Sequence, residues 1–161
     1  AQWSRISARY NDSFREWTLF YGPDEEELGE LRLRWILQDN WLEWEFRIGE
    51  VSGTIQPKWR QNPWEWELRA DNRIFTARPI APNDPRQWRI TDNHTQITWQ
   101  TRYGNTAEEW QLRDTGAGTF SLEAEYPGDP RDWVITDDLD IHPLFKMMMT
   151  FLTVYYSSPK Q

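Results

Sequence analysis

The sequence predicts an all-β fold, in which twelve antiparallel strands form a barrel of repeated hairpins that encloses a hydrophobic C-terminal helix. Three observations carry this prediction: a nine-residue stretch that occurs twice, a tryptophan that returns at nearly regular intervals, and a terminal segment that is apolar on every side. A chain of 161 residues is long enough to bury one core, and we expect residues 1–161 to form a single domain.

The repeated stretch reads DPRQWRITD from Asp84 to Asp92 and DPRDWVITD from Asp129 to Asp137. Its tryptophans belong to a series whose members stand 22 to 27 residues apart: Trp17, Trp44, Trp66, Trp88, Trp110 and Trp133. In each copy an apolar residue follows two positions after the tryptophan, and Asp or Gly follows at the fourth or fifth position. This pattern predicts a strand with one inward face that runs into a turn.

A second alternating segment follows each of the first five turns, so each unit predicts a β-hairpin. These segments begin at Leu31, Thr54, Ile74, Gln96 and Thr119. Five hairpins, an N-terminal strand from Trp3 to Tyr10 and a last strand at Trp133 make twelve strands. Because about eight strands already suffice to fill a barrel with side chains, a barrel of twelve encloses a wider space that needs an occupant.

The C-terminal segment PLFKMMMTFLTVYY predicts that occupant. It is apolar on every side, as a helix buried on every side must be, and we place the helix at about residues 142–157. Pro143 suits a first helical turn, and the acids of DDLD, Asp137–Asp140, favour a helix N-terminus. The apolar core from Leu144 to Tyr156 is shorter than the roughly 20 residues of a membrane span, so we expect no transmembrane segment.

Charge and composition narrow the function classes. The net charge of -8 has the wrong sign for a protein that binds nucleic acid, so we expect no such partner. Cysteine is absent, which fits a reducing compartment, and we expect a cytoplasmic location, with removal of an export signal before Ala1 as the alternative. The histidines are His94, in a turn, and His142, at the helix start, and no motif such as G-x-S-x-G occurs. We therefore predict no enzyme, no catalytic residues, no metal site and no cofactor.

The tryptophans predict packing rather than a sugar-binding platform. Four of them outside the series share the inward face of their segments with apolar neighbours: Trp35, Trp59, Trp64 and Trp99. Trp41 falls on the face opposite Trp44, and it is the exposed aromatic candidate for ligand binding.

A glutamate directly precedes four tryptophans of the series: Glu16, Glu43, Glu65 and Glu109. Two carboxylates at a set separation can hydrolyse a glycosidic bond. Neighbours of an inward tryptophan point outward, however, so we expect these glutamates on the solvent face of the strands.

The hairpins, the strand ends of the form Trp or Tyr, any residue, apolar, any residue, Asp, and the hydrophobic helix after ITDD together resemble the tubby C-terminal superfamily. This superfamily includes LURP-one-related proteins and phospholipid scramblases. The resemblance covers nearly the whole chain. It implies the barrel with its central helix, a phosphoinositide head-group site of the Lys-x-Arg type, matched by Lys58 and Arg60, and a calcium site near Asp137–Asp140. From the residues alone, helix capping by these acids and ion pairing of Lys58 and Arg60 with neighbouring acids are the expected roles.

A barrel with a filled centre must act through its surface or its rims. The leading hypothesis is a non-enzymatic binding or scaffold domain whose role the sequence does not specify and whose partner is either a protein or a lipid head group. The alternative is a membrane-associated module that recognises phospholipid or phosphoinositide head groups through Lys58 and Arg60. Glycan binding or hydrolysis is the third hypothesis.

Overall fold

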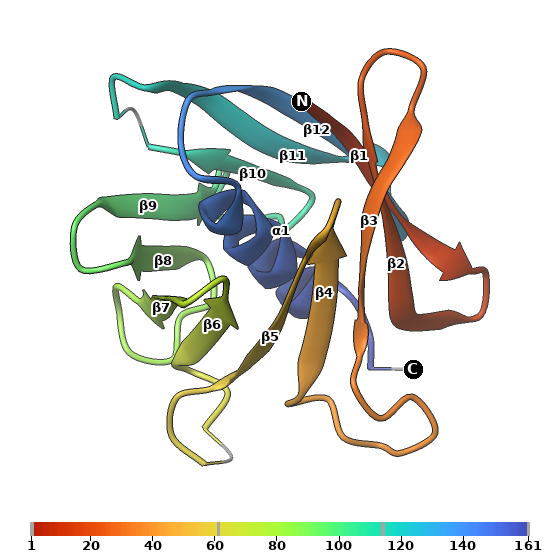
Figure 1. Ribbon diagram of the computed structural model, residues 1–161. Coiled ribbons are helices and arrows are strands. Elements are labelled where there is room, and N and C mark those ends of the chain that lie inside the picture. Colours follow the sequence, from red (N-terminus) through yellow and green to blue (C-terminus); the bar gives the residue numbers. More distant parts are fainter. Residues whose placement is uncertain (1, 61, 114, 161) are drawn as a thin grey trace.

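The computed structural model describes residues 2–60, 62–113 and 115–160. Within them, each strand pairs antiparallel with the next along the chain, and β12 pairs with β1 to close a barrel around one helix (Figure 1). The elements are β1 (Trp3–Tyr10), β2 (Ser13–Tyr21), β3 (Glu26–Leu33), β4 (Trp44–Ile48), β5 (Val51–Pro57), β6 (Trp66–Ala70), β7 (Arg73–Pro79), β8 (Gln87–Thr91), β9 (Gln96–Thr101), β10 (Glu109–Leu112), β11 (Gly118–Tyr126), β12 (Asp129–Leu139) and α1 (Pro143–Ser157). The predicted fold class, a twelve-stranded antiparallel barrel with a C-terminal helix, is confirmed.

Helix α1 lies along the inside of the barrel, and every residue from Leu144 to Tyr155 is buried. Aromatic side chains of the strands surround it. The ring of Phe151 packs edge-on against Trp66, with the ring centroids 4.8 Å apart, and the ring of Phe145 packs against Phe75 at 4.7 Å. A helix that is apolar all round is therefore buried all round, as its sequence predicts.

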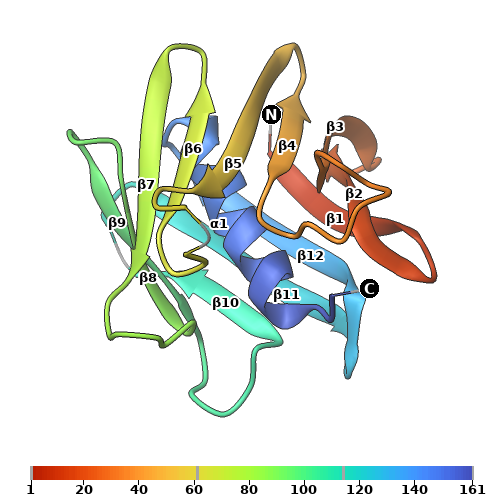
Figure 2. The same cartoon turned by 90° about the horizontal axis from the view of Figure 1, so that it is seen from below.

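The two ends of the barrel differ. Because neighbouring strands are antiparallel, alternate connections lie at the same end. One end carries four long connections, which span residues 34–43, 58–65, 80–86 and 102–108, together with the C-terminal end of α1. We call this end the loop rim. The other end, the turn rim, has tight turns such as 49–50 and 71–72 (Figure 2).

The six tryptophans of the series occupy equivalent positions near the starts of strands. Each of these strands begins at the end of the barrel that carries the loop rim, after a long connection or after one of the short turns 11–12 and 127–128. In each, the indole Nε1 donates a hydrogen bond to the carbonyl oxygen three residues earlier, at 2.8 to 3.0 Å. The acceptors are the carbonyls of Phe14, Trp41, Pro63, Pro85, Ala107 and Pro130. This bond satisfies the one polar group of a side chain that is otherwise surrounded by apolar core.

The twice-written stretch builds the same corner twice. In the first copy, Asp84 accepts hydrogen bonds from the backbone nitrogen of Arg86 at 3.0 Å and from its Nε at 2.9 Å, and the guanidinium holds the pKa of the Asp84 carboxyl below its usual range. Asp129 and Arg131 repeat these contacts at 3.1 and 2.8 Å. Each arginine also donates to a carbonyl of the neighbouring connection, which for Arg86 belongs to Gly104. The repeated residues thus join adjacent loops.

The acids before the helix do not cap it, so this prediction is wrong. Strand β12 runs on to Leu139, and the alternation of the strand turns Asp137 into the barrel. Its carboxylate pairs with the Lys146 ammonium at 2.9 Å and accepts the backbone nitrogen of Trp3 at 2.9 Å. The N-cap is His142, as expected from its position, and its Nδ1 accepts the backbone nitrogen of Leu144 at 3.2 Å.

The inward assignment of the other tryptophans is only half right. Trp99 is buried and donates to the Thr153 hydroxyl of α1 at 2.9 Å, and Trp64 is half-buried. Trp35 and Trp59, in contrast, are 44% and 58% exposed. Their strands end at Leu33 and Pro57, so the alternation from which they were assigned does not extend to them.

Candidate functional site

Most of the large hydrophobic side chains that the structure exposes lie at the loop rim or at the strand ends beside it. They are Tyr10, Trp35, Leu37, Trp59, Ile80, Tyr103 and Tyr126, and Leu37 is fully exposed. The remaining ones, Val51, Ile74 and Val134, lie near the turn rim or on the wall. An apolar surface concentrated at one end of a barrel is the type of feature that marks an interaction site.

Four of these aromatic residues directly follow a basic residue, whose charge lies over the ring. The distances from the charged group to the ring centroid are 5.9 Å for Arg9 and Tyr10, 5.1 Å for Arg34 and Trp35, 5.5 Å for Lys58 and Trp59, and 5.4 Å for Arg102 and Tyr103. These distances fit cation–π contacts. Each pair stands where a strand ends and a connection begins.

The four glutamates that precede tryptophans of the series lie at or near the other end of the same connections, and each contacts one of these basic–aromatic pairs. Glu43 accepts the Nε1 of Trp35 at 2.6 Å, and Glu65 accepts the Nε1 of Trp59 at 2.7 Å. The other two pair with the basic residue instead: Arg102 lies 3.0 Å from Glu109 and Arg9 lies 3.9 Å from Glu16. We call these arrangements the rim clamps. Each glutamate belongs to a different clamp.

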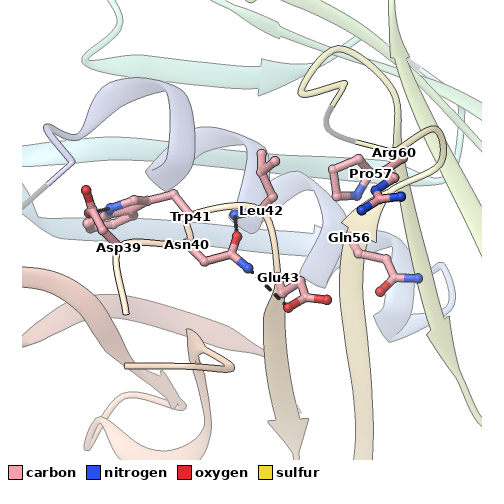
Figure 3. Close-up of a pocket in the computed structure, with 8 residues that line it drawn as sticks. All are labelled: Asp39, Asn40, Trp41, Leu42, Glu43, Gln56, Pro57 and Arg60. Atoms are coloured by element: carbon pink, nitrogen blue, oxygen red, sulfur yellow. Dashed lines mark hydrogen bonds between the residues drawn. The ribbon is translucent and has the colours of Figure 1, made fainter. Parts of the chain in front are cut away.

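A cleft of about 560 Å³ opens between the connections 34–43 and 58–65 (Figure 3). Its lining residues are Asp39, Asn40, Trp41, Leu42, Glu43, Gln56, Pro57 and Arg60. Figure 3 shows Trp41 beside Asp39 at one end, Arg60 at the other, and Leu42 between them. The structure therefore brings two of the three predicted site residues, Trp41 and Arg60, to one cleft.

Trp41 is not the freely exposed ring that its position predicts. It is half-buried, and its ring packs against Trp44 with centroids 6.1 Å apart. The guanidinium of Arg15 lies 4.9 Å and the ammonium of Lys160 5.9 Å from its centroid, while its Nε1 donates to Asp39 at 2.8 Å. Cations and a carboxylate thus hold the ring, which leaves little of it for stacking on a sugar.

Lys58 and Arg60 face different surroundings. Lys58 pairs with Glu65 at 3.8 Å and lines a groove on the outer wall of the barrel. Arg60 lines the cleft and forms no hydrogen bond or ion pair with the residues that the structure describes. Ion pairing with a neighbouring acid, the expected role from the residues alone, is therefore found for Lys58 and not for Arg60.

The DDLD stretch gives no metal-binding arrangement, because Asp137 is already engaged by Lys146 and by backbone nitrogens. Across residues 2–60, 62–113 and 115–160 the structure contains no group of three or more His, Cys, Asp or Glu side chains placed to hold a metal ion.

Among the described residues, no helix has the length and apolar character needed to cross a membrane.

The rim clamps escaped the sequence reasoning, although a signal for them exists. In four copies a basic residue followed by Trp or Tyr precedes a Glu-Trp pair by seven or nine residues: Arg9-Tyr10, Arg34-Trp35, Lys58-Trp59 and Arg102-Tyr103. Alternation within one strand does not show this signal, because the partner of each glutamate lies at the end of the preceding strand.

Comparisons of this chain with protein-family models, with curated proteins and with solved structures gave no match. The resemblance to the tubby C-terminal superfamily therefore stays a prediction.

Proposed function

We propose that this protein is a non-enzymatic binding module that docks a partner protein through its loop rim. The observation that carries the proposal is the collection of exposed aromatic and aliphatic side chains at that one end of the barrel. Trp, Tyr and Arg are the residue types that contribute most binding energy at protein interfaces. All three occur together in the rim clamps.

The clamps also favour binding by holding the rings in place. Trp35, for example, is fixed between the guanidinium of Arg34 and the carboxylate of Glu43 before any partner arrives. A side chain that is already ordered loses less rotamer entropy on binding, which is worth about 0.5–1.5 kcal/mol for each ordered side chain. The exposed rings therefore form a preorganised surface.

A non-enzymatic role is supported by the engagement of the carboxylates. The glutamates that stand before the tryptophans each accept a hydrogen bond or ion pair within a separate clamp. The barrel interior, where a substrate would be shielded from water, is filled by α1. We expect screens with esterase, phosphatase and glycosidase substrates to give no turnover, and turnover that is lost on Glu43→Gln or Glu109→Gln would contradict the proposal.

A second candidate is a membrane-associated module that recognises phospholipid head groups, as the tubby resemblance suggests. The observation in its favour is the pairing of Trp or Tyr with Arg or Lys, which is the composition of a membrane–water interface. Three of the four basic clamp residues are paired with a glutamate, however. Each unpaired cation near an anionic leaflet contributes only about 1 kcal/mol, so a chain of charge -8 gains little from them.

The test compares affinity capture by three forms of the chain. The rim variant carries Trp35→Ala and Trp59→Ala, and the control carries Val51→Ala and Ile74→Ala, which change exposed side chains near the turn rim. We expect a partner that the wild type and the control retain and the rim variant loses, and the purified partner should then bind the three forms in the same order.

Two results would overturn the protein-docking proposal. One is a partner that the rim variant retains as well as the wild type does. The other is rim-dependent sedimentation with phosphatidylserine vesicles in the absence of any protein partner, which would promote the lipid candidate instead.

A further inference from the structure

The outer wall of the barrel sets two positive charges side by side. Arg78 of β7 stands directly opposite Arg89 of β8 in the sheet register. Both side chains point outward, because the buried residues Ala77, Trp88 and Ile90 alternate with them. Like charges directly opposite on paired strands repel each other. Neither arginine forms an ion pair with any residue that the structure describes, so no ion pair among these residues offsets the repulsion.

Arg89 has, in addition, an unused hydrogen-bond donor. Its Nε is closed off from solvent, and no described residue accepts a hydrogen bond from it. Buried donors in folded proteins nearly always have an acceptor, because a donor removed from water without one destabilises the fold. The guanidinium therefore lacks an acceptor on the side that faces the wall.

A groove of about 210 Å³ collects these groups. It is lined by Lys58, Glu65, Thr76, Arg78, Arg89, Thr91, Asn93 and Gln96. The carboxylate of Glu65 is occupied, since it accepts Trp59 Nε1 at 2.7 Å and pairs with Lys58 at 3.8 Å. Thr76 and Thr91 form the next opposed pair on the same outward face of the sheet and supply hydroxyl groups. The charges of the groove therefore sum to about plus two in a chain whose net charge is -8.

We infer that this groove is a binding site for a doubly charged oxyanion of the phosphate-monoester class. Guanidinium groups bind such oxygens through paired, charge-assisted hydrogen bonds. An oxyanion between Arg78 and Arg89 offsets their repulsion and accepts hydrogen bonds from the solvent-facing nitrogens of the two guanidinium groups, and Thr76 and Thr91 line the same groove with their hydroxyls. The site lies on the wall and does not depend on docking at the loop rim.

The test titrates the full chain with inorganic phosphate and follows the Nε–H signals of the arginines by NMR. The variants are Arg78→Gln and Arg89→Gln. The matched control is Arg69→Gln, which changes an exposed arginine of β6 that pairs with Glu67 at 2.5 Å. We expect a saturable shift of the Arg89 signal, an affinity lower by about tenfold in each groove variant, and an unchanged affinity in the control. A linear shift without saturation, or equal losses in all three variants, would overturn the site.

Thermal unfolding provides a second readout that does not require the variants to bind anything. Without phosphate, Arg78→Gln should unfold at a higher temperature than the wild type, because it removes the repulsion. Phosphate should raise the midpoint of the wild type more than that of the variant, because the variant binds it about tenfold more weakly. A variant that is less stable than the wild type without phosphate, or that gains as much from phosphate, would contradict the inference.

Two further ligands identify the source of the phosphate. Soluble inositol bisphosphate and phosphatidylcholine vesicles with a phosphatidylinositol bisphosphate present the same chemistry free and on a membrane. If the protein binds both the soluble compound and the vesicles, and Arg89→Gln abolishes both, the result supports the site and identifies a lipid head group as its ligand. If the protein binds the soluble compound alone, and Arg89→Gln abolishes this binding, the result supports the site and identifies a free phosphate ester as its ligand. Binding of either compound that Arg89→Gln leaves intact would contradict the site.

Discussion

At the scale of single residues, each tryptophan of the series stabilises the fold both through its ring and through the hydrogen bond of its one polar atom, Nε1. The large ring fills the space between the sheet and α1, and the Nε1 hydrogen bond to the carbonyl three residues earlier fixes the direction in which the chain enters the strand. A phenylalanine could supply most of the apolar contact and none of the bond. This explains why the sequence repeats tryptophan at these positions.

The first prediction compares a buried tryptophan of the series with an exposed tryptophan of the rim. Trp88→Phe should lower the free energy of unfolding by about 2–3 kcal/mol, because it leaves the Pro85 carbonyl without its donor and opens a small cavity. Trp59→Phe is the control, since that ring is 58% exposed and belongs to a rim clamp, and it should change the free energy by less than about 0.5 kcal/mol. Both variants lose an indole hydrogen bond, and only that of Trp88 lies at the edge of the core. Denaturant unfolding measures both, and equal losses of free energy would show that burial of the Trp88 ring and its bond adds no stability.

At the scale of elements, one buried ion pair joins the last strand to the helix. Asp137 and Lys146 have side chains that are only 1% and 9% exposed. The carboxylate also accepts the backbone nitrogens of Trp3 and Leu139, so the first strand, the last strand and α1 meet at this group. The pair lies near the turn rim, where the barrel closes between β1 and β12.

The second prediction tests this junction by removing one charge. Lys146→Met should destabilise the fold by about 3–5 kcal/mol, because it leaves the Asp137 carboxylate buried without a counter-charge. Adding Asp137→Asn to this variant should recover part of the loss, since the amide still accepts the backbone nitrogens without carrying a charge. A single variant as stable as the wild type would show that the pair is open to water.

The end of the helix at the loop rim makes a pH-dependent contribution. Burial raises the pKa of Tyr155 from about 10 to about 12. The folded state therefore favours the neutral phenol, and its contribution is fully present below pH 10 and is lost as the pH rises toward 12. The loss is about 2–3 kcal/mol. Denaturant unfolding at pH 8 and at pH 11 should show less alkaline destabilisation in Tyr155→Phe than in the wild type, and parallel losses would contradict this.

Much of the fold follows from local patterns, and much of the site does not. Alternating side chains and turn residues at regular spacing predict twelve strands, and the apolar terminal segment predicts the helix within one or two residues of its ends. Alternation predicts the direction of a side chain only within a strand. The inward prediction for Trp35 and Trp59 is wrong because both residues follow the last residue of their strands. Trp41 and Arg60 come from different connections, and the pairing of β4 with β5 brings these connections to one cleft. The capping role predicted for Asp137 is wrong because the strand continues past it and turns its side chain into the barrel, although an acid before a helix usually caps it.

At the scale of the whole molecule, the packed interior that stabilises the barrel is separate from the loop rim that we propose for binding. The interior is occupied by α1, and one end carries short connections. The other end carries long connections whose exposed rings are held by the rim clamps. A surface of this kind can vary its side chains without disturbing the core, because the clamps lie outside the tryptophan corners.

A map of amide hydrogen exchange in the protein, alone and bound to the partner recovered by affinity capture, tests the loop-rim assignment most directly. We predict slower exchange in residues 34–43 and 58–65 on binding, with the turns 49–50 and 71–72 unchanged, because the partner covers the clamps of the loop rim. Protection confined to the turn rim, or to the outer wall of β7 and β8, would contradict the account.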